Sequence, residues 1–265
     1  MDLSEIKMVV TDMDGTLLNS NHEVSDYFFE LFKELRKRDI VFVAASGRQY
    51  NSIVDKLDPI KDDIVVLAEN GGFAMQNGTE LVSTPLHNDA KNEVLSILEN
   101  VEDVHPVLCG KQNAYLLGNS REFENKLSEY YTAYEVLEDL KSFKGEVMKI
   151  AIYHSESSEK YIYPSVKHLE AHLKVKVSGE NWVDVSDQNA HKGYALQKVQ
   201  EQYAISPTQT LVFGDYNNDL EMLALADYSF AMANAHPNVK KAANYMTASN
   251  DDFGVEKVLE KLLDS

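Results

Sequence analysis

Two aspartates stand one residue apart directly after an apolar run near the N-terminus. The run 8–11 (MVVT) is typical of a buried strand, and Asp12, Asp14 and Gly15 follow it. Two carboxylates held this close repel each other and raise each other's pKa. On its own, a sequence of this form is also typical of an acidic turn. The pair therefore indicates either a turn or a site whose negative charge is neutralised by a cation.

Three further polar segments each follow an apolar run. Ser46 and Gly47 follow the run 40–45 (IVFVAA), the segment 69–72 (ENGG) follows the run 64–68 (IVVLA), and the segment 214–219 (GDYNND) follows the run 210–213 (TLVF). Open α/β sheets bind their ligands beyond the carboxyl ends of the strands. We therefore expect these polar residues to meet at one edge of a sheet.

Four carboxylates would gather at that edge, those of Asp12, Asp14, Asp215 and Asp219. The offered ligands are hard oxygens, with no His or Cys among them, which favours Mg²⁺ over Zn²⁺. The Ser46 hydroxyl, nearby backbone N–H groups and a lysine would suit the oxygens of a phosphate. Taken singly, each polar segment has a simpler interpretation as a turn or a helix cap, and the lysine has a simpler interpretation as a solvated surface residue. Coincidence does not explain well why all of them occur in this order.

The elements that must position these residues alternate between strand and helix. We expect strands at 6–11, 40–45, 64–68, 210–213 and 228–231, and helices at 25–38, 50–57, 192–203, 220–226 and 253–263, the first of them capped by Ser25. Strands that are apolar throughout are typical of a parallel sheet covered on both faces. The pattern predicts an α/β fold with a doubly wound parallel sheet and right-handed crossovers.

The middle of the chain has a different pattern. Hairpins are expected at 73–84 and 173–185, strands at 104–108, 114–117 and 147–153, and helices at 89–100 and from Ser120 to about 131. Pro164 should interrupt any helix between 157 and 173, so the main helix there is expected to begin near it. We predict a discontinuous core domain, 1–83 and 187–265, with an inserted α+β domain at 84–186.

Composition limits the possible partners. The chain has 265 residues, 44% of them hydrophobic, and its 25 basic and 43 acidic residues give a net charge of −18. Such a surface repels nucleic acid and anionic lipid, so neither is expected as a partner. Cys109 is the single cysteine, which excludes an intrachain disulfide and fits a reducing compartment. With no signal-like or membrane-spanning run, we expect a soluble, cytoplasmic protein. The oligomeric state cannot be read from the sequence.

Together, these motifs resemble those of a known family. In order, they are the segments 12–18 (DMDGTLL), 45–48 (ASGR), 191–193 (HKG) and 214–219 (GDYNND). The sequence resembles the haloacid dehalogenase (HAD) superfamily of phosphotransferases, in particular its Cof-type, class IIB branch of sugar-phosphatase-like hydrolases. The resemblance covers the whole chain and implies a Rossmann-like core. The insert lies between the second and third motifs, the position of a type IIB cap.

The resemblance implies a role for each catalytic and metal-binding residue. Asp12 would be the nucleophile that attacks phosphorus and forms an aspartyl-phosphate. Asp14 would protonate the leaving alcohol and then activate water, and its pKa is expected to rise enough for this. Mg²⁺ would be held by the Asp12 carboxylate, the Asp14 backbone carbonyl and the Asp215 carboxylate.

Other residues would bind the substrate phosphate or support the site. By the same resemblance, Ser46, Gly47, Lys192 and Asn218 hold the phosphoryl oxygens. Asp219 would orient Lys192 or a metal-bound water, and Thr16 would fix its loop by hydrogen bonding. In the inserted domain, a few side chains are weak candidates for substrate contact, with packing or solvation the simpler interpretation: His87, His105, Tyr115, Trp182 and Asp184.

The predicted function is a Mg²⁺-dependent phosphatase that acts on a small phosphorylated metabolite, with a sugar phosphate as the favoured substrate. A sugar phosphomutase or phosphotransferase remains an alternative, because the same aspartyl-phosphate can pass to a second hydroxyl. A non-catalytic metabolite-binding protein is a third interpretation. The presence of both Asp12 and Asp14 argues against it.

Overall fold

The structure is a computed structural model that describes residues 2–111, 113–118, 120–127 and 133–265. It divides into two compact units, Met1–Ser83 with His191–Ser265, and Thr84–Ala190. The sequence placed the second boundary at 186/187, four residues before the division at 190/191. None of the helices among the described residues is long and apolar enough to cross a membrane.

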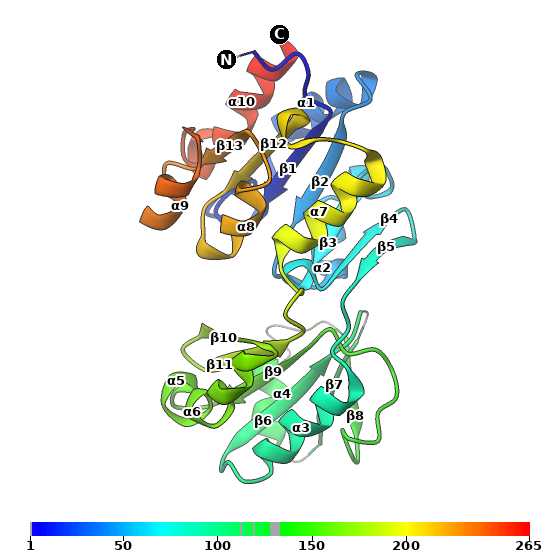
Figure 1. Ribbon diagram of the computed structural model, residues 1–265, viewed down its shortest axis with the longest axis vertical. Helices are drawn as coiled ribbons and strands as arrows, with labels where there is room; N and C mark the ends of the chain where they lie inside the picture. The colour runs from blue at the N-terminus through cyan, green and yellow to red at the C-terminus, as the bar shows by residue number, and fades with distance from the viewer. Residues whose placement is uncertain (1, 112, 119, 128–132) are drawn as a thin grey trace. The chain divides into compact units, whose positions relative to one another are not determined.

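The first unit is built on one sheet, with the strand order β14-β13-β12-β1-β2-β3-β4-β5 (Figure 1). Its parallel strands are β1 (Met8–Asp12), β2 (Val41–Ala45), β3 (Val65–Ala68), β12 (Thr210–Gly214), β13 (Tyr228–Ala231) and β14 (Tyr245–Met246). The hairpin of β4 (Phe73–Gln76) and β5 (Thr79–Ser83) extends the sheet antiparallel to β3. The predicted α/β fold is confirmed.

Helices cover both faces of this sheet. They are α1 (Asp26–Lys37), α2 (Tyr50–Lys56), α7 (Lys192–Tyr203), α8 (Leu220–Leu223), α9 (Pro237–Ala242) and α10 (Gly254–Leu263). Right-handed crossovers put α1 and α2 on one face, and α8 and α9 on the other, because the strand order runs in opposite directions from β1. As predicted, Ser25 caps α1, its hydroxyl accepting from the Phe28 N–H at 3.0 Å. Helix α8 ends at Leu223, three residues before the predicted end.

Strand burial explains why these runs form the centre of the unit. All five residues of β1 and all five of β12 are buried. The face of β2 under α1 packs aromatic rings together, with Phe28 and Phe32 of the helix 5.2 and 5.7 Å from Phe42 between ring centroids. Removing this much apolar surface from water is the main stabilising contribution to the fold. The rigid strands can then hold polar residues at their ends.

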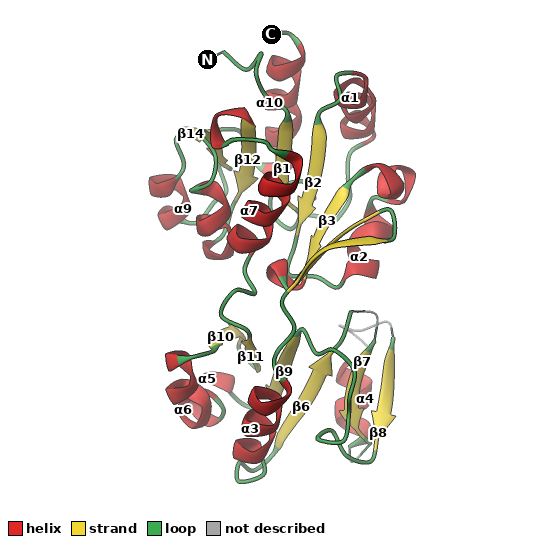
Figure 2. Ribbon diagram, turned by 45° about the vertical axis from the view of Figure 1, so that its right-hand side comes forward, coloured by secondary structure: helices red, strands yellow, loops and turns green. Residues whose placement is uncertain are grey.

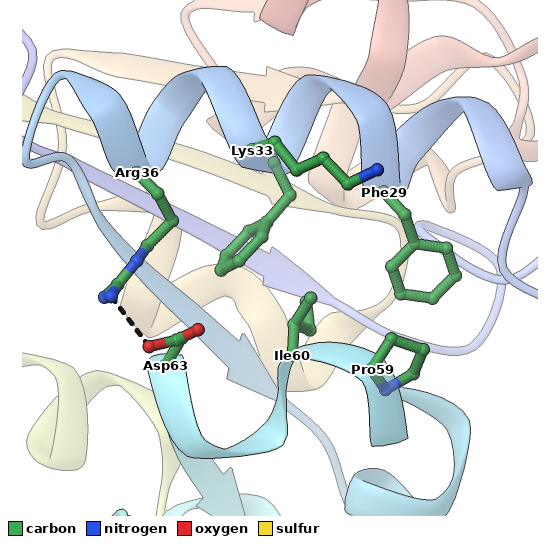
Figure 3. A pocket seen from close by; sticks show the side chains of 7 residues that line it. Phe29, Lys33, Arg36, Pro59, Ile60 and Asp63 are labelled. Atoms are coloured by element: carbon green, nitrogen blue, oxygen red, sulfur yellow. Dashed lines mark ion pairs between the residues drawn. The ribbon is translucent and has the colours of Figure 1, made fainter.

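A shallow hollow lies on the outer surface of this unit, between α1 and the 3-10 turn η1 (Asp58–Asp63) (Figure 3). It encloses about 270 Å³, with Phe29, Phe32 and Ile60 in its apolar part. Arg36 and Asp63 form an ion pair of 2.7 Å at its rim. Both elements end just before a strand begins, so the hollow lies toward the amino ends of the strands. It is therefore remote from the edge where ligands of such sheets bind.

The second unit is an α+β domain, seen with its strands in yellow in Figure 2. Its sheet has the order β10-β11-β9-β6-β7-β8, with strands β6 (Val104–Cys109), β7 (Ala114–Leu117), β8 (Tyr134–Leu137), β9 (Lys149–His154), β10 (Lys174–Gly179) and β11 (Trp182–Ser186). Its helices are α3 (Asn88–Leu98), α4 (Arg121–Leu127), α5 (Ser158–Tyr161) and α6 (Tyr163–Val166). Separate apolar clusters form on the two faces of the sheet, and Cys109 is buried in the smaller one.

Two details of this unit correct the sequence-based expectations. The strand β8 was not predicted, and it pairs parallel to β7. Pro164 lies in the first turn of α6 as expected, but α6 is only four residues long and a 3-10 turn, Lys167–Ala171, follows it in place of a main helix. Helix α4 is described to Leu127, and the rest of its predicted range, 128–131, lies outside the described residues.

Candidate active site

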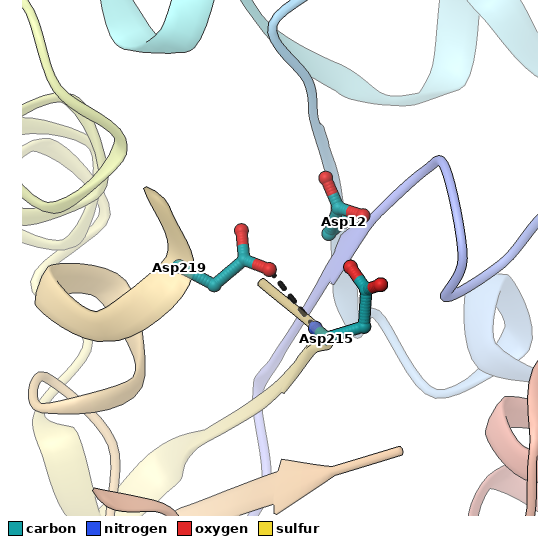
Figure 4. Close-up of side chains that lie close together, drawn as sticks. All are labelled: Asp12, Asp215 and Asp219. Carbon is teal, nitrogen blue, oxygen red and sulfur yellow. Dashed lines mark hydrogen bonds between the residues drawn. The ribbon is translucent and has the colours of Figure 1, made fainter. Parts of the chain in front are cut away.

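Three aspartates converge at the carboxyl edge of the first sheet. Asp12 ends β1, and Asp215 directly follows β12, the strand that pairs with β1. Figure 4 shows these two carboxylates together with that of Asp219, which comes from the turn after β12. Each offers one oxygen, and the three oxygens lie within 4.8 Å of one another. The strand order thus brings together side chains that are some 200 residues apart in the sequence.

Lys192 supplies a buried positive charge to this cluster. It is the first residue of α7, and its side chain is fully buried. Its ammonium group forms ion pairs with Asp12 and, at 2.7 Å, with Asp219. The preceding residue, His191, caps the helix, because its Nδ1 accepts from the Tyr194 N–H at 3.2 Å. The helix start therefore fixes the point from which the lysine reaches the carboxylates.

Asp219 has both of its carboxylate oxygens engaged within the chain. Oδ1 accepts from Lys192, and Oδ2 accepts from the backbone N–H groups of Asp215 and Tyr216 at 2.9 and 3.1 Å. These bonds hold Lys192 and the Asp215 loop in place. Among the three aspartates, the arrangement leaves Asp12 and Asp215 as the carboxylates with oxygens available to a metal.

The loop after β1 is folded tightly against Asp215. Gly15 has φ +77°, and a Cβ at this position would collide with the Asp215 carboxylate. The hydroxyl of Thr16 lies 3.5 Å from Asp215 Oδ1, and Asn234 Nδ2 donates to the Gly15 carbonyl at 2.8 Å. Glycine is needed here for both the left-handed backbone and the close approach.

Asp14 points to Arg48, a residue to which the sequence analysis gave no role. The Arg48 guanidinium donates to both Asp14 oxygens, through Nε at 2.7 Å and through a second nitrogen at 2.5 Å. His22 Nδ1 lies 3.5 Å from the same carboxylate. The Ser46 hydroxyl, which is buried, accepts from the Arg48 N–H at 3.1 Å. The position of Arg48 directly after Ser46-Gly47, as the one cation of that loop, was the available signal.

The cluster of Asp12, Asp215, Asp219 and Lys192 contains more acidic than basic groups. Burial raises the pKa of Asp12, and Asp219 and Asp215 raise it further against the opposing effect of Lys192. Burial and the charge of Asp219 raise the pKa of Asp215 to about 6. Lys192 keeps its proton, since its two carboxylate partners outweigh the effect of burial and raise its pKa. Asp12 and Asp215, with hard oxygen ligands and unbalanced negative charge, fit the requirements of Mg²⁺.

The pKa of Asp14 lies below its ordinary value, which contradicts the expectation of a raised pKa. Burial acts to raise it, but the hydrogen bonds and charge of Arg48 and the nearby His22 outweigh burial. The side chain is also 42% exposed, so water contributes to solvating the carboxylate. A raised pKa was expected from the neighbouring carboxylates and from a side chain that does not bind the metal, without the effect of a cation 34 residues away in the sequence.

Asn218 and Gly47 lie beside the same sheet edge and share a neighbour, Asn70. Asn218 Nδ2 donates to Asn70 Oδ1 at 3.0 Å. A Cβ at Gly47 would lie 3.0 Å from Asn70 Nδ2. Asn70 belongs to the predicted polar segment 69–72, but the sequence analysis assigned it no role.

The weak candidates of the inserted domain all belong to the second unit and have contacts within it. Aromatic neighbours surround three of them, since His105 stacks on Phe123 at 4.5 Å, Trp182 lies 5.0 Å from Tyr153, and Tyr115 lies 4.1 Å from Phe143. His87 caps α3, and Asp184 forms an ion pair of 3.5 Å with Lys149. Aromatic packing, as the sequence favoured, accounts for three of these residues, and a helix cap and an ion pair account for the other two.

A comparison with known proteins identifies the family. The family model for haloacid dehalogenase-like hydrolases matches residues 9–259. The chain belongs to this family. The resemblance to the HAD family inferred from the sequence is thereby confirmed, as is the interpretation that the chain is an enzyme, a hydrolase of this family.

Relatives of this hydrolase match it over nearly its whole length. The 5-amino-6-(5-phospho-D-ribitylamino)uracil phosphatase YbjI of Escherichia coli is 30% identical over 97% of this chain and 96% of the relative. A Streptococcus mutans protein of known crystal structure is 31% identical and superposes with a TM-score of 0.85 over 98% of this chain and all of that chain. The HAD subclass IIB sugar phosphatase BT4131 is 20% identical, with a TM-score of 0.77 over 96% of this chain and 98% of its own, and shares the fold.

Proposed function

We propose that this HAD-like hydrolase is a Mg²⁺-dependent phosphatase that acts on a small phosphorylated metabolite through an aspartyl-phosphate on Asp12. The observation that carries the proposal is the buried ion-pair arrangement of Lys192 with Asp12 and Asp219, beside Asp215. A carboxylate that attacks a phosphate must overcome the repulsion between two anions. Positive charge fixed next to both groups lowers that barrier.

Asp12 is the proposed nucleophile because it ends β1 on a rigid strand and its carboxylate contacts Lys192. The Asp12 and Asp215 carboxylates and the Asp14 carbonyl would hold Mg²⁺, which supplies charge neutralisation to the phosphoryl group when bound. Covalent catalysis then splits a difficult hydrolysis into two easier steps.

Phosphate binding is assigned to groups on three neighbouring loops. The Ser46 hydroxyl and the backbone N–H of Gly47 follow β2, Lys192 begins α7, and Asn218 follows β12. Hydrogen-bond donors that converge in this way are suited to phosphoryl oxygens. Thr16 and Asp219 support the site through Asp215 and Lys192.

Asp14 is the proposed general acid for the leaving alcohol and general base for the attacking water. In the structure its carboxylate is held by Arg48 with a lowered pKa, which suits the base more than the acid. The acid step therefore requires the Asp14 side chain to leave Arg48 and take up a proton before it meets the leaving oxygen.

For the substrate, two classes have support. A sugar phosphate is favoured by the resemblance to class IIB phosphatases. A ribitylamino-pyrimidine phosphate is favoured by two relatives whose names state that substrate, at 30% and 24% identity. In either case we assign substrate selection to the inserted domain, residues 84–190. Transfer of the phosphoryl group to a second hydroxyl, as in a mutase, is the competing reaction.

The test is a phosphate-release assay on p-nitrophenyl phosphate and on a panel of phosphorylated sugars, polyols and the ribitylamino-pyrimidine. We expect free phosphate from p-nitrophenyl phosphate with Mg²⁺, none after chelation by EDTA, and one metabolite class preferred at least tenfold. An isomeric sugar phosphate without free phosphate would instead establish a mutase. No turnover of any compound with Mg²⁺ would refute the proposal.

A further inference from the structure

The turn after β3 is a conspicuous backbone feature to which the mechanism above assigns no task. Glu69, Asn70 and Gly71 have consecutive positive φ angles of 50°, 56° and 89°. The left-handed region is disfavoured for L residues, although Asn and Asp tolerate it better than most. Two adjacent non-glycine residues in this region must be held there by their surroundings, and such strain is typical of functional sites.

This turn is tied to the loop that carries Ser46 and Gly47. The Asn70 N–H donates to the Ser46 carbonyl at 2.9 Å, and the Glu69 N–H donates to the Arg48 carbonyl at 3.0 Å. The side-chain amide of Asn70 packs against Gly47, where a Cβ would come within 3.0 Å of it. Any shift of the turn therefore moves this phosphate-binding loop.

The same turn also lies against the start of α7. A Cβ at Gly71 would come within 2.5 Å of the His191 carbonyl oxygen and 2.9 Å of the Lys192 backbone nitrogen. The turn thus contacts the backbone that presents Lys192. The turn at 69–71 therefore contacts both the loop that carries Ser46 and Gly47 and the start of α7.

The side chain of Asn70 makes a further contact, with Asn218. Asn218 is half-buried, and its Nδ2 donates one N–H to Asn70 Oδ1 at 3.0 Å. An amide nitrogen carries two N–H groups in one plane, so engaging one of them fixes the direction of the other. The free amide of an unrestrained asparagine would rotate among several directions.

We propose that Asn70 is a positioning residue, which orients the amide of Asn218 so that its second N–H is presented to the transferred phosphoryl group. The left-handed backbone at 69–71 is what brings the Asn70 side chain between Gly47 and Asn218. The inference rests on the proposed function, in which Asn218 binds phosphate.

The chain offers a matched pair of substitutions for the test. Asn70→Gly removes the side-chain acceptor while keeping a residue that adopts positive φ without strain. Asn77→Gly is the control, because Asn77 also has positive φ (45°) but is exposed in the β4–β5 turn. A loss seen with the first and not with the second comes from the Asn70 side chain and not from a left-handed Asn-to-Gly change as such.

The experiment is a double-mutant cycle of Asn70→Gly and Asn218→Ala. For each protein, kcat/KM for p-nitrophenyl phosphate and Kd for inorganic phosphate are measured with Mg²⁺ present. We expect Asn70→Gly alone to lower kcat/KM and to raise the Kd for phosphate by about fivefold to tenfold. This is less than the loss of a whole hydrogen bond to a charged group, because the Asn218 amide remains and loses only its orientation. In the Asn218→Ala background the same change should alter them by less than about twofold, because the two residues act as one unit. Asn77→Gly should change neither value, and the melting temperatures of the two glycine variants should agree.

Coupled losses in phosphate binding support the inference. Independent, additive losses, or an Asn70→Gly protein that matches the wild type, would overturn it even if the enzyme is an active phosphatase. Failure of the proposed function is seen separately, as a wild-type protein without turnover. In that case the phosphate Kd values still decide, and a wild-type protein that does not bind phosphate would overturn the inference as well.

Discussion

At the scale of single residues, the aspartates of the site differ in the cationic side chains that they contact. Lys192 forms ion pairs with both Asp12 and Asp219, whereas Asp14 forms its ion pair with Arg48. The two aspartates that we propose as catalytic therefore differ in their electrostatics, since the pKa of Asp12 is raised and that of Asp14 is lowered. This difference suits a nucleophile that awaits a metal and a base that is ready to activate water.

The ion pair between Arg48 and Asp14 leads to a prediction about pH. In Arg48→Met the pKa of Asp14 should rise, because burial then acts on the carboxylate without the opposing guanidinium. The acid form of Asp14 would persist to higher pH, so the alkaline limb of kcat/KM should move to higher pH. The measurement is a pH–rate profile with a substrate whose alcohol leaves poorly.

The control for this prediction is Arg36→Met, which breaks the ion pair with Asp63 at the opposite end of the strands. Its profile should match that of the wild type. An Arg48→Met profile whose alkaline limb stays in place, or moves to lower pH, would show that Arg48 does not set the pKa of Asp14.

At the scale of elements, the site depends on how closely the loops after neighbouring strands approach one another. The loop after β1 passes so near Asp215 that Gly15 has no room for a side chain. The turn after β3 contacts both the loop after β2 and the start of α7. The geometry is therefore a property of loop packing at the carboxyl edge of the sheet.

Gly15→Ala should disturb the proposed metal site without unfolding the protein. The added Cβ would push the Asp215 carboxylate away, so we expect kcat/KM to fall by tenfold or more and the Mg²⁺ requirement to rise. Gly78→Ala is a matched control, because Gly78 has φ +73° but open space around its missing Cβ. It should cost only about 1 kcal/mol of stability, with unchanged activity. Equal effects of the two variants on activity would contradict the account.

The sequence was sufficient to predict the elements whose burial is uniform. The fully buried runs of β1, β3 and β12 and the capped helix α1 were predicted to within a few residues. The missed strand β8 is only four residues long and lies at the edge of its sheet. Three of its residues are exposed, so burial does not distinguish it from a loop although its sequence, YEVL, is largely apolar. Helix α8 was predicted too long, since the run 224–226 remains apolar after the helix ends.

The sequence could predict which residues belong to the candidate site, but not which of them contact one another. Residues that follow parallel strands must meet at one edge, which is why Asp12 and Asp215 were grouped correctly before their distances were known. Lys192 begins a helix, and the family resemblance was what assigned it to the site. The contacts of Arg48 with Asp14 and of Asn70 with Asn218 depend on loop conformation. Their left-handed or tightly packed backbones come from tertiary contacts, which no local pattern records.

At the scale of the whole molecule, the acidic cluster links the stability of the fold to pH and to the metal. The pKa of Asp215 is about 6 in the folded chain, above the ordinary value of 3.8. Between these values the folded state binds more protons than the unfolded state, so the stability of the metal-free protein should fall as the pH rises from about 4 to about 6. If Mg²⁺ binds as proposed, it should offset this loss by neutralising the ionised carboxylates.

The gain in melting temperature on adding Mg²⁺ should therefore be larger at pH 8 than at pH 5, by on the order of a few degrees. Differential scanning fluorimetry with Mg²⁺ and with EDTA measures it. In Asp215→Asn the gain should be small at both values. If the gain in melting temperature were the same at pH 5 and pH 8 in the wild type, the stabilisation by Mg²⁺ would not come from binding to these carboxylates.

The central claim, that Asp12 carries the phosphoryl group, is tested most directly by trapping the phosphoenzyme. Acetyl phosphate has a leaving group that needs no acid, so Asp14→Asn should still be phosphorylated but should lack the base for hydrolysis. After incubation of ³²P-labelled acetyl phosphate with Mg²⁺ and an acid quench, we predict strong protein-bound label in Asp14→Asn and none in Asp12→Asn. Label retained by Asp12→Asn, or no label in Asp14→Asn while the wild type releases phosphate, would contradict the account.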